Sequence, residues 1–221
     1  MRAFIVANGQ AGDGERYAAL VRPGDLVIAA DGGAALALQM GLQPQAVIGD
    51  MDSIPAELRS RLEALGCRFI HHPERKDETD TELAIRHALQ QGAHEVFLLG
   101  ATGGRLDHTL ANVFLLALPE LRNISARIMA GSTDIWLLRD RLDIEGRQGD
   151  IVTLLPLGQD AFGVKTQGLE YALQGDTLRF GQARGVSNVM TSAVARISLR
   201  KGLLLVLHVR SGQENTPAGH G

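Results

Sequence analysis

Four short acidic segments stand out by their residue types and by their position after apolar runs. They cover residues 31–33, 49–53, 76–80 and 103–108, and each contains at least one aspartate. In an α/β sheet, residues just past parallel strands converge on one edge, where ligands bind. Carboxylates gathered at that edge repel one another, and a Mg²⁺ ion carrying a polyphosphate would offset the repulsion. The pattern therefore predicts a nucleotide site that uses Mg²⁺.

The second segment places two aspartates two residues apart. Asp50 and Asp52 directly follow the apolar run at residues 46–48. In an extended chain, residues i and i+2 point to the same side, so both carboxylates could face one hard cation. A polar turn that caps the following helix would use the same residues, and the pair alone does not separate the two interpretations.

The third segment joins a cation to two carboxylates at the start of a helix. Thr79 and Glu82 form a capping box, which places Asp80 in the first helical turn. Asp77 and Asp80 would both interact favourably with the helix dipole, so capping explains them without a ligand. Lys76 adds a charge that could reach a phosphate.

A glycine-rich loop covers residues 100–105 between a strand and a helix. Gly103 and Gly104 would let backbone N–H groups approach phosphate oxygens, and Arg105 supplies a planar fork for the same group. The segment lacks the Gly-Lys-Ser/Thr ending of a P-loop and does not match the dinucleotide fingerprint. A tight turn that needs glycine for positive φ is the alternative.

Two further features allow a structural interpretation as readily as a functional one. Asp107 and His108 could contact a ligand or could be the N-cap and first turn of a helix. Residues 9–14 form another glycine-containing loop after a strand-like run, and a surface turn is the better interpretation of it.

The spacing of apolar residues indicates the elements that carry these segments. Strands are predicted at residues 3–7, 26–30, 46–48, 67–70 and 96–99, with helices over 34–40, 55–65, 79–91 and 106–118. After about residue 125, strand-like runs follow one another without helices, at 126–129, 135–138, 151–155, 171–173, 177–180, 193–199 and 203–209.

This order predicts an α/β fold: an N-terminal, mostly parallel α/β sandwich domain followed by a C-terminal antiparallel β-sandwich domain. The expected domains are residues 1–125, binding ATP and metal, and residues 126–210, forming the β-sandwich. Residues 211–221, rich in Gly, Pro, Asn and Thr, are expected to be a disordered tail.

Composition restricts the class of protein. The chain has 221 residues, is 45% hydrophobic and 21% charged, and carries a formal net charge of -3. Such a charge argues against a nucleic-acid surface, which is normally basic, and no run is long and apolar enough to span a bilayer. The single cysteine, Cys67, forms no intrachain disulfide, is expected to be a buried inert thiol, and fits a reducing cytoplasm.

Each motif is modest, but their joint order is specific. Asp-Gly-Gly, Gly-Asp-x-Asp-Ser, Lys-Asp-x-Thr-Asp and Gly-Gly-Arg-x-Asp-His, each after a strand, resembles the thiamine pyrophosphokinase (thiamine diphosphokinase) family. The second half carries a looser likeness to the C-terminal pattern of that family, at residues 168–171, 178–181 and 185–188. The resemblance covers nearly the whole chain apart from the tail.

The resemblance implies an enzyme that moves a pyrophosphoryl group from ATP to the hydroxyl of thiamine, giving thiamine diphosphate and AMP. It also implies an N-terminal domain that binds ATP and Mg²⁺, a β-sandwich that helps form the thiamine site, and a homodimer with active sites at its interface. No nucleic-acid or membrane partner is expected.

The resemblance also assigns residues by motif. Asp50, Asp52 and Asp80 would be Mg²⁺ ligands, with Asp31 and Asp77 near the metal or substrate. The residues expected to hold the nucleotide phosphates are Lys76, Arg105 and Asp107, with Gly103 and Gly104 of the glycine-rich loop. The residues expected to contact thiamine are Ser187, Asn188 and Tyr171, the last in place of a tryptophan that stacks on the pyrimidine in some members.

Two other functions compete with this hypothesis. A pyrophosphokinase acting on a hydroxymethyl pterin would use the same ATP and metal chemistry, and a non-catalytic nucleotide-sensing module would retain binding without turnover. The sequence around Tyr171, Ser187 and Asn188 favours thiamine. A purely structural interpretation explains each aspartate as a cap or turn but not the order of the four segments.

Overall fold

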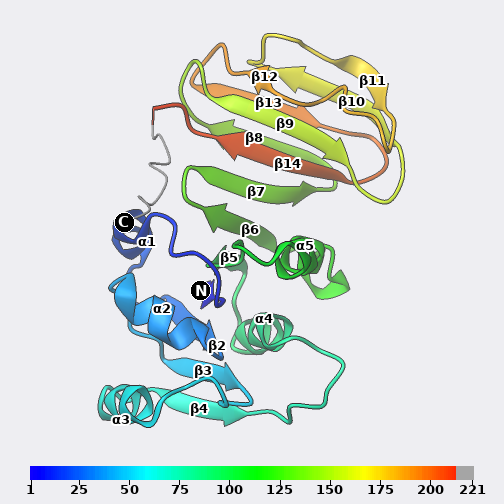
Figure 1. Ribbon diagram of the computed structural model, residues 1–221. Coiled ribbons are helices and arrows are strands. Elements are labelled where there is room, and N and C mark those ends of the chain that lie inside the picture. The colour runs from blue at the N-terminus through cyan, green and yellow to red at the C-terminus, as the bar shows by residue number, and fades with distance from the viewer. Residues whose placement is uncertain (213–221) are drawn as a thin grey trace. The chain divides into compact units, whose positions relative to one another are not determined.

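The computed structural model describes residues 1–212 and divides into two compact units, the first covering Met1–Gly131 and the second beginning at Ser132 (Figure 1). The part of the predicted tail from residue 213 onward lies outside the described residues. The boundary between the compact units follows Gly131. The functional division at residues 125 and 126 stays a prediction. No helix in the described range is both long and apolar enough to cross a membrane.

Unit 1 is built on a fully parallel sheet, as the alternating pattern predicts. Its strands are β1 (Arg2–Val6), β2 (Leu26–Ala30), β3 (Ala46–Gly49), β4 (Arg68–His71), β5 (Glu95–Leu99) and β6 (Ser125–Ala130). The order across the sheet is β6-β5-β1-β2-β3-β4, with parallel pairing throughout. Strands β2, β3 and β4 lie on one side of β1, and strands β5 and β6 lie on its other side. This reversal of the strand order makes a topological switch point between β1 and β5.

Helices cover both faces of this sheet (Figure 1). They are α1 (Gly14–Leu20), α2 (Gly33–Gln39), α3 (Ala56–Ala64), α4 (Asp80–Gln90) and α5 (Leu106–Leu115). In α4 the buried residues Ala84, Ile85 and Ala88 follow helical spacing, so one face of this helix packs against the sheet while its first turn stays at the sheet edge. Cys67 is buried, as predicted, and burial raises the pKa of its thiol to about 11.

Unit 2 consists of two antiparallel sheets, which agrees with the predicted β-sandwich. Its strands are β7 (Thr133–Leu138), β8 (Arg141–Glu145), β9 (Ile151–Pro156), β10 (Ala161–Gln167), β11 (Gln174–Leu178), β12 (Asn188–Val189), β13 (Val194–Ser198) and β14 (Leu204–Val209). Their orders are β12-β9-β14-β7 and β11-β10-β13-β8. Alternate residues of the strands, such as Val152, Leu154, Ile197 and Val206, form its core.

One predicted strand of unit 2 is wrong. Residues 171–173 form no strand, and β11 begins only at Gln174. The Tyr171 backbone is instead bonded to the Asn188 side chain, and the Leu173 N–H donates to Thr166 Oγ1 at 2.9 Å. Here side-chain hydrogen bonds supplement a single backbone bond, from the Thr166 N–H to Leu173 O at 3.0 Å, and periodicity does not reveal such bonds.

The buried carboxylate of Asp150 hydrogen-bonds to residues at and just after the end of β14 in unit 2. Asp150 Oδ2 lies 2.8 Å from His208 Nε2 and accepts from the Arg147 N–H at 2.9 Å. Asp150 Oδ1 accepts from both the N–H and the hydroxyl of Ser211 at 2.9 Å. Burial alone would raise the pKa of Asp150, but the hydrogen bonds from Arg147, Ser211 and His208 outweigh it and lower the pKa to about 2.

Asp150 should make unit 2 sensitive to acid. Because its pKa is lower in the folded state, its stabilisation is complete above about pH 4 and is lost as the pH falls toward 2. The loss corresponds to roughly 2 kcal/mol of unfolding free energy. Denaturant unfolding at several pH values would measure it. The Asp150→Asn variant should show a shallower pH dependence over this window, and equal slopes in the two proteins would contradict the assignment.

Candidate active site

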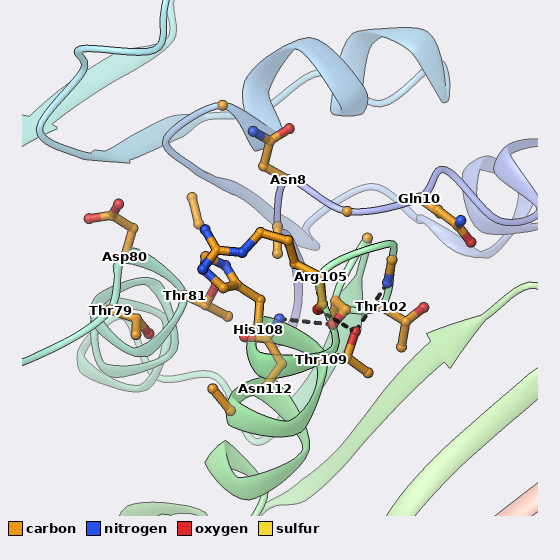
Figure 2. Close-up of a pocket in the computed structure, with 18 of the residues that line it drawn as sticks. Asn8, Gln10, Thr79, Asp80, Thr81, Thr102, Arg105, His108, Thr109 and Asn112 are labelled. Carbon is orange, nitrogen blue, oxygen red and sulfur yellow. Dashed lines mark hydrogen bonds between the residues drawn. The ribbon is translucent and has the colours of Figure 1, made fainter.

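A cavity of unit 1 lies at the carboxyl edge of its sheet. It has a volume of about 790 Å³ and is lined by the segments that follow β1, β2 and β5 and by the first turns of α4 and α5. This volume falls within the range of small-ligand sites. Figure 2 shows the side chains around it, with Asp80 from α4, Arg105 and His108 at the start of α5, and Asn8 and Gln10 from the loop after β1.

The structure brings together most, but not all, of the predicted nucleotide-site residues. Those that line the cavity are Asp31, Asp80, Gly103, Gly104, Arg105 and Asp107. Lys76 does not line it, but its Nζ lies 2.7 Å from Asp80 Oδ1. Asp50 and Asp52 occupy the neighbouring turn, where Asp50 Oδ1 accepts from the Asp52 N–H at 3.1 Å. Asp77 is exposed and also lies outside the lining.

Asp31 is held in an unusual conformation at the centre of this edge. Its φ of 43° lies in the left-handed region, and its N–H donates to Ile48 O at 2.8 Å. One carboxylate oxygen accepts from the Ser53 hydroxyl, which links the segment after β2 to the segment after β3. The other oxygen, Oδ1, is buried and has no hydrogen-bond partner among the described residues. A buried carboxylate oxygen without a donor favours a cation or donor from a ligand.

Gly49 allows Asp31 and Asp80 to approach each other. A Cβ added at Gly49 would lie 2.8 Å from Asp31 Cβ and 3.2 Å from Asp80 Cγ, and φ there is 156°. Glycine is therefore required so that the two carboxylates can flank the end of β3. Within residues 1–212, however, no three acidic, histidine or cysteine side chains lie close enough to hold a metal ion by themselves.

The first two turns of α5 fix the glycine-rich loop. Thr109 Oγ1 accepts from the Gly103 N–H and donates to Arg105 O, both at 3.2 Å, and Asn112 Nδ2 donates to Ala101 O at 2.8 Å (Figure 2). The Gly103 N–H is thus engaged within the protein. Gly104 is more open, since an added Cβ there would meet nothing within 4 Å.

The start of α5 is well suited to an anion. Arg105 is the N-cap residue and makes no capping hydrogen bond with its side chain, so Asp107 is not the cap. The N-cap side chain therefore does not occupy the start of the helix, which lines the cavity. The Arg105 guanidinium hydrogen-bonds to the Asp107 carboxylate and lowers the pKa of that group, although both side chains are exposed.

Sequence patterns missed several residues of the cavity. Asn8, Gly9 and Gln10 line it, whereas the sequence favours a surface turn for residues 9–14. The Gln10 N–H donates to Thr102 O at 2.8 Å, so the loops after β1 and β5 meet backbone to backbone. The signal in the sequence that could have indicated these residues is Gly9, a glycine that follows the first strand of a parallel sheet. Thr109 and Asn112 gave no comparable signal, because their role depends on the loop they hold.

The hydrogen bonds of the Thr109 hydroxyl to the glycine-rich loop can be tested by substitution. Thr109→Val removes both hydrogen bonds at nearly constant volume, at about 1 kcal/mol each, so the KM for ATP should rise about thirtyfold. Thr109→Ser keeps the hydroxyl and should stay within about twofold of the parent protein by the same reasoning. Steady-state kinetics at varied ATP would separate the two variants, and equal KM values would refute a positioning role.

In unit 2, the structure brings Tyr171 next to Asn188. Asn188 Oδ1 accepts from the N–H groups of Tyr171 at 3.0 Å and Val189 at 2.9 Å, while its Nδ2 donates to Tyr171 O at 2.8 Å. Asn188 is buried and holds the loop in place, and the Tyr171 side chain is 68% exposed. Ser187, at φ 58°, is exposed, and its N–H donates to Thr153 Oγ1 at 3.0 Å.

Comparison with known proteins identifies the family. A model described as the catalytic domain of thiamin pyrophosphokinase matches residues 17–128, and a model described as its vitamin B1 binding domain matches residues 140–204. The chain belongs to the thiamin pyrophosphokinase family. The predicted nucleotide-site residues all lie within the first matched range, and Tyr171, Ser187 and Asn188 lie within the second.

Individual relatives agree with this family. Thiamine pyrophosphokinase of Bacillus subtilis is 29% identical over 184 residues, covering 82% of this chain and 86% of that protein. Thiamine pyrophosphokinase 1 of Arabidopsis thaliana is 29% identical over 200 residues, covering 83% and 73%. The crystal structure of the B. subtilis enzyme superposes with a TM-score of 0.86 at 27% identity, covering 96% of this chain and all of that one. Yeast thiamin pyrophosphokinase, at 16% identity and a TM-score of 0.77, shares the fold.

Members of the thiamin pyrophosphokinase family are enzymes, and this chain is a transferase of the kinase type. The pterin and sensor alternatives are not favoured, because the matches include both the catalytic and the vitamin B1 binding models.

Proposed function

We propose that the chain transfers the pyrophosphoryl group of ATP to the hydroxyl of thiamine, giving thiamine diphosphate and AMP. The cavity at the carboxyl edge of unit 1, with Asp31 and Asp80 on one side and the start of α5 on the other, is the main support. It lies within the part of the chain that matches the catalytic-domain model. Thiamine-dependent release of AMP from ATP would test the activity, and AMP release with a hydroxymethyl pterin but not with thiamine would refute it.

In this proposal the phosphates of ATP lie against the start of α5. The uncapped N–H groups of the helix, the Arg105 guanidinium and the Gly104 backbone supply positive potential and hydrogen-bond donors. Lys76 is paired with Asp80 and could move to a phosphate when a cation reaches that carboxylate. Asp107 would orient Arg105 through their shared hydrogen bonds.

We propose Mg²⁺ as the metal, held by Asp50, Asp52 and Asp80. Mg²⁺ is commonly bound by one or two carboxylates together with substrate phosphates, so a ready-made cage of three carboxylates is not required. The unpartnered Asp31 Oδ1 beside Asp80 fits such a cation and the water molecules around it. When bound, Mg²⁺ would neutralise charge on the phosphate oxygens.

The residues of the chain then orient the reaction. Arg105 and the start of α5 would stabilise negative charge that develops during in-line displacement of AMP. Asp77 or Asp80 would accept the proton of the thiamine hydroxyl. In unit 2, Asn188 would hold the loop that presents the Tyr171 ring for stacking on thiamine, with Ser187 beside it in sequence as a further contact.

Removal of divalent metal provides a separate test of the Mg²⁺ proposal. Turnover should disappear with excess chelator and return when Mg²⁺ is added in excess, because the carboxylates of this edge outnumber the cations paired with them, Lys76 at Asp80 and Arg105 at Asp107. Undiminished turnover in the chelated enzyme would contradict a metal-dependent reaction.

We propose a homodimer in the cytoplasm. An exposed apolar stripe on α5 supports self-association: Leu106 is 68% exposed, Leu110 46% and Phe114 55%, each four residues apart on one helix face. Sedimentation analysis would measure the mass in solution.

A cytoplasmic location is supported by the single, buried cysteine.

A further inference from the structure

A cationic row crosses the outward face of the four-stranded sheet of unit 2. The strand register places Lys165 of β10, Ser198 of β13 and Arg141 of β8 side by side in one row. The next row contains Gln167, Arg196 and Asp143 in the same strands. The residues that alternate with them, including Thr166 and Ile197, are buried, so the two rows face away from the core.

These rows enclose a shallow hollow of about 180 Å³. It is lined by Arg141, Lys165, Gln167, Arg196, Ile197 and Ser198. Three of these side chains are cations, and two others offer a hydroxyl and an amide. The hollow is smaller than sites for drug-sized ligands, which begin at about 300 Å³. It suits a single small group rather than a whole nucleotide.

The acidic side chains nearby do not balance this charge. Asp143 lies 3.1 Å from Arg141 Nε and 3.4 Å from Arg196 Nε, and hydrogen bonding to Arg141 lowers its pKa. Asp176, on the neighbouring strand β11, is paired with Arg184 at 2.7 Å. Lys165 has no acidic partner within residues 1–212. Three cations and one shared carboxylate leave two positive charges across the two rows.

Sheet stability accounts for only part of this arrangement. Arg196 directly opposite Asp143 is a favourable cross-strand pair. Lys165 and Arg141, in contrast, face the neutral residue Ser198 and not an acidic one directly across the sheet. A dianion seated between them would add charge-assisted hydrogen bonds that the sheet itself does not supply.

We propose that this hollow is a binding site for a phosphate group, either as inorganic phosphate or as the terminal phosphate of a small metabolite. Arg141 and Arg196, which also hydrogen-bond to Asp143, would each direct a remaining guanidinium N–H to the phosphate. Lys165 would add a point charge, and Ser198 and Gln167 neutral donors. The site lies on unit 2 and uses none of the residues proposed for the transfer reaction.

Residue-resolved NMR of the full chain would test the site during titration with inorganic phosphate at constant ionic strength. The chemical shifts of the Ser198 and Gln167 amides should change and reach a plateau as the phosphate concentration rises. Phosphate binding in the cavity of unit 1 would instead change the amide shifts of residues that line that cavity. Lys165→Gln should raise the Kd at the hollow about fivefold, the effect of one exposed ion pair. It should leave kcat unchanged. Arg61→Gln, which removes an exposed cation from α3, should leave the Kd unchanged.

Several outcomes would overturn the proposal. They are the absence of saturable shifts at Ser198 and Gln167, shifts that chloride reproduces at equal ionic strength, and a Kd that Lys165→Gln does not change. Stronger binding of a short single-stranded oligonucleotide than of phosphate would replace the small-anion site with a nucleic-acid surface. Tighter binding of a phosphate monoester than of inorganic phosphate would support the proposal and assign the metabolite as the source.

Discussion

Replacing Asp80 with asparagine is expected to lower kcat by at least about a hundredfold while leaving the fold intact. Asp80 lines the cavity, approaches Asp31 across Gly49, and carries the carboxylate paired with Lys76. Asparagine keeps the size of the side chain but not its negative charge. The proposed metal would therefore lose a charged ligand, and Lys76 would lose the carboxylate with which it forms an ion pair. Rate measurements at saturating ATP and thiamine would give the loss in kcat.

The fold should survive this change because the capping of α4 does not depend on Asp80. Thr79 is the N-cap residue, and its hydroxyl accepts from the Glu82 N–H at 3.2 Å. Circular dichroism and thermal unfolding would verify this. Asp140→Asn, the same chemical change between β7 and β8 of unit 2, is the matched control and should keep normal turnover. Near-normal kcat in a folded Asp80→Asn protein would remove Asp80 from the reaction.

The second large effect is expected from one added methyl group at Gly9. A Cβ there would lie 2.3 Å from both Gly100 O and Thr102 O, which are backbone atoms that cannot turn away. Gly9→Ala must therefore separate the loops after β1 and β5, which meet at the cavity. Such overpacking costs about 1–3 kcal/mol. We expect a lower Tm together with a KM for ATP raised at least about tenfold.

Gly104→Ala is the matched control for Gly9→Ala. It introduces the same methyl group into the glycine-rich loop, where an added Cβ meets nothing within 4 Å. Its Tm should remain close to that of the parent protein. If both variants behave alike, the close approach of the two loops does not shape the site.

Local pattern was sufficient for most of unit 1. The predicted strands at residues 26–30 and 46–48 correspond to β2 and β3, because these buried strands are continuous apolar runs bounded by turn residues. Helix α1 was not predicted. With 7 residues it is too short to be stable by itself. Tyr17 holds it in place, since its hydroxyl bonds to Met129 O at 3.2 Å and to the Gly131 N–H at 2.8 Å, more than a hundred residues away.

Unit 2 was harder to predict in detail. The strand β10 contains Gly163 at φ 66° and register shifts against β11, so its residues do not alternate cleanly. The sequence predicted no strand there. In contrast, β8 alternates exposed and more buried residues over Arg141–Glu145, and this alternation is the sequence signal of a strand.

For the candidate site, sequence identified the acidic segments but not how they meet. The order of the motifs placed Asp31, Asp80 and Arg105 at one sheet edge, and the cavity contains all three. The free oxygen of Asp31, the engaged N–H of Gly103 and the contact of Gly9 with the second loop each depend on residues distant in sequence. Spacing along the chain does not determine such contacts.

Isotope transfer tests the central claim most directly. The purified chain would be incubated with Mg²⁺, thiamine and ATP labelled at the γ-phosphate, and the products separated by chromatography. Transfer of a pyrophosphoryl group predicts label in thiamine diphosphate together with an equal amount of unlabelled AMP. Labelled thiamine monophosphate together with ADP would show simple phosphoryl transfer and would contradict the proposed reaction.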